Sequence, residues 1–239
     1  MSNPYFQFKQ FTVFHHHCAM KVGVDSVMLG AWADVVQAKN ILDVGTGCGL
    51  LALMLAQRND NATITAIDID ENAALQAAEN VQNSIWKNRI EVQNITLQQF
   101  ANTTDKRFDL IICNPPFFVN SLQTPDKQRT TARHATDLTH EDLIFCAKKL
   151  LTEQGKLSLI LPVKEAGNCL AIAELSALFC NRKTTVFPKP NAAPKRILLE
   201  LGGIEAAIPH NDAITILATN GKEFTPEYTE LVKDFYLKM

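Results

Sequence analysis

The residues best suited to chemistry in this 239-residue chain are Asn114, Pro115, Pro116 and Phe117. They directly follow the apolar run Phe108–Cys113, which has the composition of a buried strand. The Asn114 side-chain oxygen and the Pro115 backbone oxygen can accept two hydrogen bonds from an exocyclic amino group, while Phe117 stacks on the attached ring. The grouping predicts a group-transfer enzyme that acts on a planar amine.

A glycine-rich turn upstream has the composition of a nucleotide-binding loop. Asp43 ends a predicted strand, and Gly45, Gly47 and Gly49 follow it before a predicted helix. Glycines at this point let the backbone approach a ligand where a Cβ atom would clash. Their spacing, G-x-G-x-G, differs from the G-x-G-x-x-G of dinucleotide-binding proteins. We expect Asp43 and the three glycines to bind a cofactor, although Asp43 also suits the capping of a turn.

The ends of the next two strands supply further candidate cofactor contacts. Asp68 stands where a carboxylate can accept both hydroxyls of a ribose, and Ile69 follows it. Helix N-capping is the alternative for these acidic residues, and Asp70 fits that role better than Asp68. Asn94 and Ile95 end the third strand, where enzymes with a similar cofactor loop often have an acidic residue beside the base of the cofactor, and this resemblance implies the same place for them.

The alternative for Asn114 and Pro115 is a strand that simply ends in a rigid turn. The added Pro116 and Phe117, downstream of the glycine loop, favour the functional interpretation. Cys113 suggests a thiol attack on a pyrimidine, but strand alternation should turn it away from the face that presents Asn114. We therefore predict catalysis by positioning and electrostatics, without a strong general base.

Segments rich in Ile, Val and Leu alternate with helical patterns along the chain. The predicted strands are Asn40–Val44, Ala62–Asp68, Arg89–Asn94, Phe108–Cys113, Lys156–Leu161, Thr184–Phe187 and Arg196–Leu201. The predicted helices are Val24–Val36, Leu50–Gln57, Glu71–Trp86, Glu141–Leu151, Lys164–Phe179 and Pro226–Tyr236. Such alternation requires right-handed crossovers between parallel strands, hence a doubly wound α/β sheet. The last strand follows its predecessor without a helix, so we expect it to run antiparallel.

The composition fits one α/β domain spanning residues 1–239, with an N-terminal segment (1–38), a sheet core (39–203) and a C-terminal extension (204–239). No apolar run approaches the roughly 20 residues of a membrane span, and the N-terminus does not resemble a signal peptide, so we expect a cytoplasmic protein with reduced cysteines. His15, His16 and His17 are consecutive, which favours a surface or RNA-facing patch over a metal site.

The segment Met20–Trp32, the residues at 114–117, the run 132–134 with Leu138, and the closing Asp234–Tyr236 together resemble the bacterial tRNA1(Val) adenine-N6 methyltransferases. The resemblance covers nearly the whole chain. It implies a Rossmann-like class I fold with a mostly parallel seven-stranded sheet and one antiparallel strand. It also implies S-adenosyl-L-methionine as cofactor and tRNA adenosine 37 as target. Lys21, Gly23 and Asp25 are then expected to help enclose the cofactor, although Asp25 also suits a helix N-cap.

Two basic stretches are candidates for phosphate contacts, because the net charge of −2 gives the chain no global attraction to RNA. The first lies within residues 118–139, a connection too long to be idle, and the second within 182–196. Ordinary solvated charge is the alternative for both. The predicted RNA-binding residues are Lys127, Arg129, Arg133, His134, Lys189, Lys195 and Arg196.

Rival functions remain open on the sequence alone. A glutamine-N5 methyltransferase of release factors also uses an Asn-Pro-Pro turn, but such enzymes usually place tyrosine where this chain has Phe117. A DNA adenine-N6 methyltransferase would be expected to carry a separate sequence-reading domain. A nicotinamide oxidoreductase would need the other glycine spacing. No metal, membrane or obligate protein partner is indicated.

Overall fold

The computed structural model describes residues 3–18, 20–115 and 138–239. Pro116 and Phe117 therefore lie outside the described residues. So do the predicted RNA contacts Lys127, Arg129, Arg133 and His134. Within the described ranges, no helix has both the length and the apolar character needed to cross a membrane.

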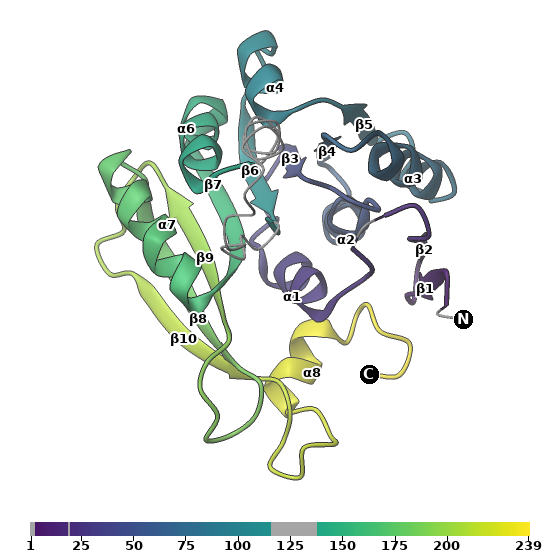
Figure 1. The fold of residues 1–239 in the computed structure, drawn as a ribbon, viewed down its shortest axis with the longest axis vertical. Helices are drawn as coiled ribbons and strands as arrows, with labels where there is room; N and C mark the ends of the chain where they lie inside the picture. The colour runs from purple at the N-terminus through teal and green to yellow at the C-terminus, as the bar shows by residue number, and fades with distance from the viewer. Residues whose placement is uncertain (1–2, 19, 116–137) are drawn as a thin grey trace, which may run out of the picture.

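The described residues form an eight-stranded sheet in the order β10-β8-β9-β7-β6-β3-β4-β5 (Figure 1). Only β9 runs against the others: it pairs antiparallel with both β7 and β8, as its hairpin-like placement predicted. The sheet has one strand more than predicted, because β10 joins the outer edge parallel to β8. The strands are β3 (Asn40–Val44), β4 (Thr63–Asp68), β5 (Ile90–Asn94), β6 (Phe108–Cys113), β7 (Leu151–Pro162), β8 (Phe179–Phe187), β9 (Arg196–Gly202) and β10 (His210–Thr215).

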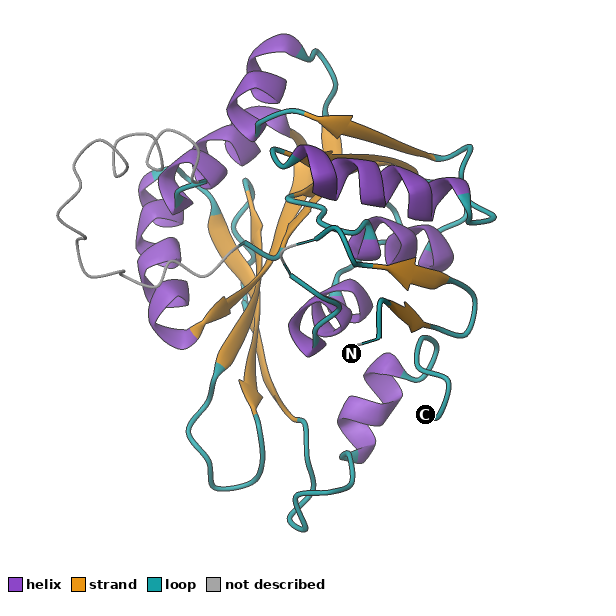
Figure 2. Ribbon diagram, turned by 45° about the vertical axis from the view of Figure 1, so that its right-hand side comes forward, coloured by secondary structure: helices purple, strands orange, loops and turns teal. Residues whose placement is uncertain are grey.

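Helices cover both faces of the sheet, which gives three layers (Figure 2). Two groups of buried apolar residues, one per face, form the core: one includes the helices α1, α2 and α8, and the other α4, α6 and α7. The helices are α1 (Val24–Trp32), α2 (Leu50–Arg58), α3 (Glu71–Gln82), α4 (Leu97–Thr103), α6 (His140–Leu150), α7 (Val163–Leu175) and α8 (Pro226–Val232).

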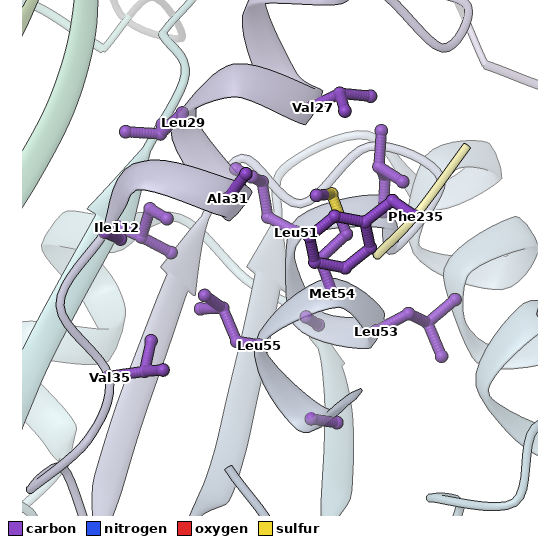
Figure 3. Close-up of a cluster of buried hydrophobic side chains, with 14 of the residues drawn as sticks. Val27, Leu29, Ala31, Val35, Leu51, Leu53, Met54, Leu55, Ile112 and Phe235 are labelled. Carbon is purple, nitrogen blue, oxygen red and sulfur yellow. The ribbon is translucent and has the colours of Figure 1, made fainter. Parts of the chain in front are cut away.

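Helix α1 is a core element rather than a surface appendage. Its Leu29 and Val27 are fully buried and pack near Leu51 and Met54 of α2, with Phe235 from the C-terminal end beside them (Figure 3). Burying side chains of this size contributes about 1.5–3 kcal/mol each. The chain that leads into α1 is thereby fixed beside the carboxyl ends of the central strands.

A small antiparallel hairpin precedes α1. It consists of β1 (Tyr5–Gln7) and β2 (Thr12–Phe14) and lies against α3, close to the C-terminal end of the chain (Figures 1 and 2). The buried Asn80 side chain of α3 bonds both the N–H and the C=O of Phe14, at 2.9 and 2.7 Å, and also the Cys48 carbonyl at 2.8 Å. One amide thus joins the hairpin to the glycine loop.

Candidate active site

A pocket of about 290 Å³ opens at the carboxyl ends of β3, β4 and β6, where ligands bind in doubly wound sheets. Val44, Ile67 and Cys113 from the three strand ends form part of its lining. The glycine loop, the segment before α1 and the start of α4 supply the remaining walls. Seven of the predicted cofactor residues line this pocket: Lys21, Gly45, Gly47, Asp68, Ile69, Ile95 and Asn114.

The glycine loop is held open towards the pocket. Gly45 and Gly47 have φ of +67° and +57°, a left-handed conformation that L side chains rarely adopt, and a Cβ on either would meet no atom within 4 Å. The Gly45 N–H donates to the Ile67 carbonyl at 2.9 Å, and the Gly47 N–H donates to Asp68 Oδ2 at 2.8 Å. The loop therefore offers open space above a backbone that the end of β4 already fixes.

Asp68 is the acceptor at the centre of this wall. Its Oδ2 accepts from Gly47 and its Oδ1 from the Asp70 N–H at 2.9 Å, so each oxygen keeps a lone pair for a ligand hydroxyl. Burial raises the pKa of Asp68, against these two backbone hydrogen bonds. Asp70 caps α3 through Asn72 N and Ala73 N, as predicted.

Three predicted cofactor residues support the pocket without lining it. Asp43 is fully buried beneath the loop, where its Oδ2 accepts from Thr46 Oγ1 at 2.5 Å and from Ala52 N at 3.1 Å. Asp43 therefore caps the turn of the glycine loop, which was the alternative to ligand contact. Burial raises the pKa of Asp43 to about 7. Gly49 packs its Cα side against Ala77 of α3, and Asn94 donates to the carbonyls of the residues at 68 and 69.

The segment before α1 borders the pocket, but not through all the residues predicted. Gly23 is the N-cap of α1, and Asp25 instead forms an ion pair with Arg196, with 2.7 Å between Asp25 Oδ2 and Arg196 Nε. This pair joins the start of β9 to the N-terminal segment. Asp25 is therefore not the N-cap of α1, which was its alternative role. The same ion pair occupies the guanidinium of Arg196, which was predicted to contact RNA. The pocket-lining residues of this segment are Cys18, Met20, Lys21, Val22 and Ser26.

Asn114 directly follows β6, and its side-chain amide is hydrogen-bonded to Ser26. Its Nδ2 donates to Ser26 Oγ at 2.8 Å, while Oδ1 is buried and accepts no hydrogen bond from any described residue. A buried carbonyl oxygen left without a donor is unfavourable by about 1–3 kcal/mol. Pro115 follows and is buried.

Cys113 is among the pocket-lining residues, but it packs in the buried group that includes α4, α6 and α7, whereas Asn114 bonds Ser26 of α1 on the other face, as strand alternation predicted. The residue is 1% exposed, and burial raises the pKa of its thiol well above the ordinary value. A buried thiol of this kind remains protonated and is a poor nucleophile, which argues against covalent catalysis.

The second basic stretch is divided in the structure. Lys189 and Lys195 are exposed in the connection between β8 and β9, whereas Arg196 is half-buried in its pair with Asp25. Among the three histidines, His16 and His17 are exposed but His15 is buried, with 3.0 Å between its Nε2 and the Asn3 carbonyl. No group of three His, Cys, Asp or Glu side chains in the described part of the chain is arranged to hold a metal ion.

Several pocket residues were not identified from the sequence. Thr96, Leu97 and Gln98 line the pocket at the start of α4, a helix that was not predicted. The sequence does contain a signal for the start of this helix, because Thr96 and Gln99 form a capping box. Ser26 had no local signal, since its partner Asn114 is distant in sequence.

The sheet order, the glycine loop with Asp68, and the strand-end asparagine define a methyltransferase-like α/β enzyme. Residues 17–179 match the methyltransferase small domain family. A solved structure described as a predicted O-methyltransferase from Agrobacterium tumefaciens has the same fold, with a TM-score of 0.69, 22% identity, and coverage of 88% of this chain and 96% of that one. A ribosomal protein L11 methylase from Lactobacillus delbrueckii gives a TM-score of 0.53 at 20% identity, covering 74% of this chain and 76% of that one.

The sequence relatives are more specific. A tRNA1(Val) (adenine(37)-N6)-methyltransferase of Parabacteroides distasonis is 46% identical over 239 residues, covering 100% of both chains. One from Haemophilus influenzae is 44% identical and covers 98% of both chains. The chain belongs to the tRNA1(Val) (adenine(37)-N6)-methyltransferase family.

Proposed function

We propose that this protein transfers a methyl group from S-adenosyl-L-methionine to the N6 amino group of adenosine 37 in tRNA1(Val). The observation that carries the proposal is the buried Oδ1 of Asn114 at the pocket, which has no partner among the described residues and is an acceptor that suits an exocyclic amine. The reaction and position named for the relatives, which match this chain over its whole length, agree with that chemistry.

The residues of the pocket fit the cofactor. Asp68 keeps two lone pairs for the ribose hydroxyls, and the open space above Gly45 and Gly47 suits a ligand that passes close to the backbone. Ile69 and Ile95 would flank the base, because both line the pocket next to Asp68. S-adenosyl-L-methionine would supply an electrophilic methyl group bonded to a sulfonium.

The chain's own contribution is to orient a weak nucleophile. The lone pair of an adenine amine is delocalised into the ring. Hydrogen bonds from the amine to Asn114 Oδ1 and to the Pro115 carbonyl would favour a pyramidal nitrogen with its lone pair directed at the methyl group. As that nitrogen gains positive charge, the same two oxygens would stabilise it. The N–H proton can then leave to solvent after the new N–C bond has formed, so no strong base is needed.

The test is methyl transfer from labelled S-adenosyl-L-methionine to one of four acceptors: unmodified tRNA1(Val), the same tRNA with guanosine at position 37, duplex DNA, or a release factor. Digestion to nucleosides and mass analysis identify the product. N6-methyladenosine in the first tRNA alone is the expected result. Label in the position-37 variant would overturn the assigned position, and label in DNA or in glutamine would move the activity to a rival class.

A further inference from the structure

Four aromatic rings form a continuous row on the N-terminal hairpin and the turn that follows it. The ring centroids of Tyr5 and Phe14 are 5.8 Å apart, those of Phe14 and His16 6.3 Å, and those of His16 and His17 4.1 Å. Tyr5, His16 and His17 are exposed, and Phe14 is half-buried. We call Tyr5, Phe14, His16 and His17 the ring row. It is not part of the pocket.

The ring row is fixed relative to the pocket at two points. Asn80 bonds the backbone of Phe14 and the carbonyl of Cys48, and Cys48 lines the pocket. At its other end, His17 directly precedes Cys18, which also lines the pocket. The rings therefore begin beside one pocket wall and are held by a buried side chain rather than by a free loop.

We propose that the ring row is a stacking platform for unpaired nucleotides of the RNA substrate. Exposed aromatic and imidazole rings bind single-stranded or splayed-out bases through their flat faces, without requiring a particular base. A base that enters the pocket must leave its own stack, and its neighbours then lose stacking partners. The platform offers those neighbours a new surface beside the pocket. This inference rests on the proposed function, because it assumes an RNA target.

Charge is a weaker explanation for this surface. A surface that bound the RNA backbone would instead carry lysine or arginine. The ring row contains neither, whereas Lys189 and Lys195 are exposed elsewhere.

The experiment compares three double variants at His16 and His17. Replacement of both by Ala removes the rings, replacement by Phe keeps rings without nitrogen, and replacement by Lys gives charge without a ring. Phe224→Ala is the matched control, because Phe224 is 44% exposed and contacts another ring, Tyr228, outside the ring row. The dissociation constant is measured for a tRNA1(Val) transcript, and for S-adenosylhomocysteine by calorimetry.

We expect the Ala variant to weaken tRNA binding about tenfold, with the affinity for S-adenosylhomocysteine unchanged. The Phe variant should restore tRNA binding and the Lys variant should not. A tRNA with 2-aminopurine at an unpaired position of the anticodon loop adds a direct reading. Its fluorescence should be quenched by the wild-type and Phe proteins but less by the Ala protein.

Three results overturn the platform while leaving the proposed function intact: unchanged tRNA affinity in the Ala variant, recovery by Lys as complete as by Phe, or an equal loss in Phe224→Ala. If the wild-type protein binds S-adenosylhomocysteine but neither binds nor methylates the tRNA, the proposed function fails, and the platform fails with it. Binding and methylation of tRNA by the wild-type protein thus distinguish a failure of the proposed function from a failure of the platform alone.

Discussion

The two sides of the pocket differ in how far their polar groups are hydrogen-bonded. On the β4 side, Asp68 and the glycine loop bond one another through Gly47 N, and further backbone groups fix both. On the β6 side, Asn114 has only its Nδ2 engaged, by Ser26, and its Oδ1 lacks a partner among the described residues. Within the described residues, the polar groups of the β4 side are hydrogen-bonded to one another, whereas the β6 side keeps one buried acceptor without a donor.

This difference suits two ligands with different tasks. A cofactor that must bind tightly benefits from a backbone already fixed in the binding geometry, because little conformational freedom is then lost on binding. A target amine must instead interact most strongly as it reacts, so an acceptor left unpaired in the resting protein can be satisfied in the transition state. Changes on the two sides should therefore alter different measured quantities.

Asn114→Ala should have the largest effect. Loss of the acceptor should lower kcat for tRNA methylation by about 100-fold or more, as for other preorganised groups at reacting centres. The affinity for S-adenosylhomocysteine should change far less. Asn114→Asp, which keeps an acceptor oxygen, should recover part of the activity. An Ala variant that loses cofactor affinity and kcat equally would contradict the division between the two sides.

Asp68→Ala should produce the reverse pattern. A hydrogen bond to a carboxylate contributes about 1.5–3 kcal/mol, so loss of a predicted ribose contact should raise the dissociation constant for S-adenosylhomocysteine roughly 10- to 100-fold. tRNA affinity should stay near wild type. Asp60→Asn is the control, because its side chain is 91% exposed and its ion pair with Arg89 spans 3.9 Å. A tRNA defect in Asp68→Ala without a cofactor defect would refute the assignment.

Ser26→Ala should have a smaller effect, about 5- to 10-fold on kcat, because one orienting hydrogen bond is worth about 1–1.5 kcal/mol. Without Ser26 Oγ, the Asn114 amide can rotate and present Nδ2 to the target. Ser26→Thr keeps a hydroxyl and should restore kcat. A change confined to KM, or a Thr variant as slow as the Ala variant, would show that Ser26 does not position the amide.

The parts of the fold that the sequence predicted share a strong local signal. The strands at Asn40–Val44 and Phe108–Cys113 are rich in Ile, Leu and Val, and their bounds agree with the structure. The antiparallel entry of β9 was predictable because no crossover helix precedes it. Strand β10, by contrast, is polar and largely exposed, so no apolar pattern indicated it.

The parts of the site that were missed depend on contacts between distant residues. The ion pair of Asp25 with Arg196 joins residues that are 171 positions apart, and no spacing rule records such a contact. The same holds for Ser26 with Asn114. The role of Asp43 was ambiguous for a different reason: its position at a strand end is compatible both with ligand contact and with support from below.

Asp43 is an exception to the difference between the two sides, because it lies beneath the well-bonded glycine loop and yet, within the part of the chain that the structure describes, has an unpaired oxygen. Like Asn114, it has one buried oxygen, Oδ1, without a partner among the described residues. Asp43 is fully buried and is not among the pocket-lining residues, so a proton is the available way to satisfy this atom. Burial accordingly raises the pKa of Asp43 to about 7. Both buried oxygens of Asp43 would then be satisfied only while this carboxyl is protonated.

A carboxyl whose pKa is raised in the folded state contributes stability below its unfolded pKa of about 3.9, and that stability is lost as the pH rises through the folded pKa. The unfolding temperature of the wild type should therefore fall, relative to Asp43→Asn, between about pH 4 and pH 7. The amide does not titrate, yet it can still accept from Thr46 and Ala52. Thermal unfolding of both proteins across this range measures the difference. If that difference stays constant with pH, Asp43 does not titrate in this range, and the contrast between the two sides then needs no exception.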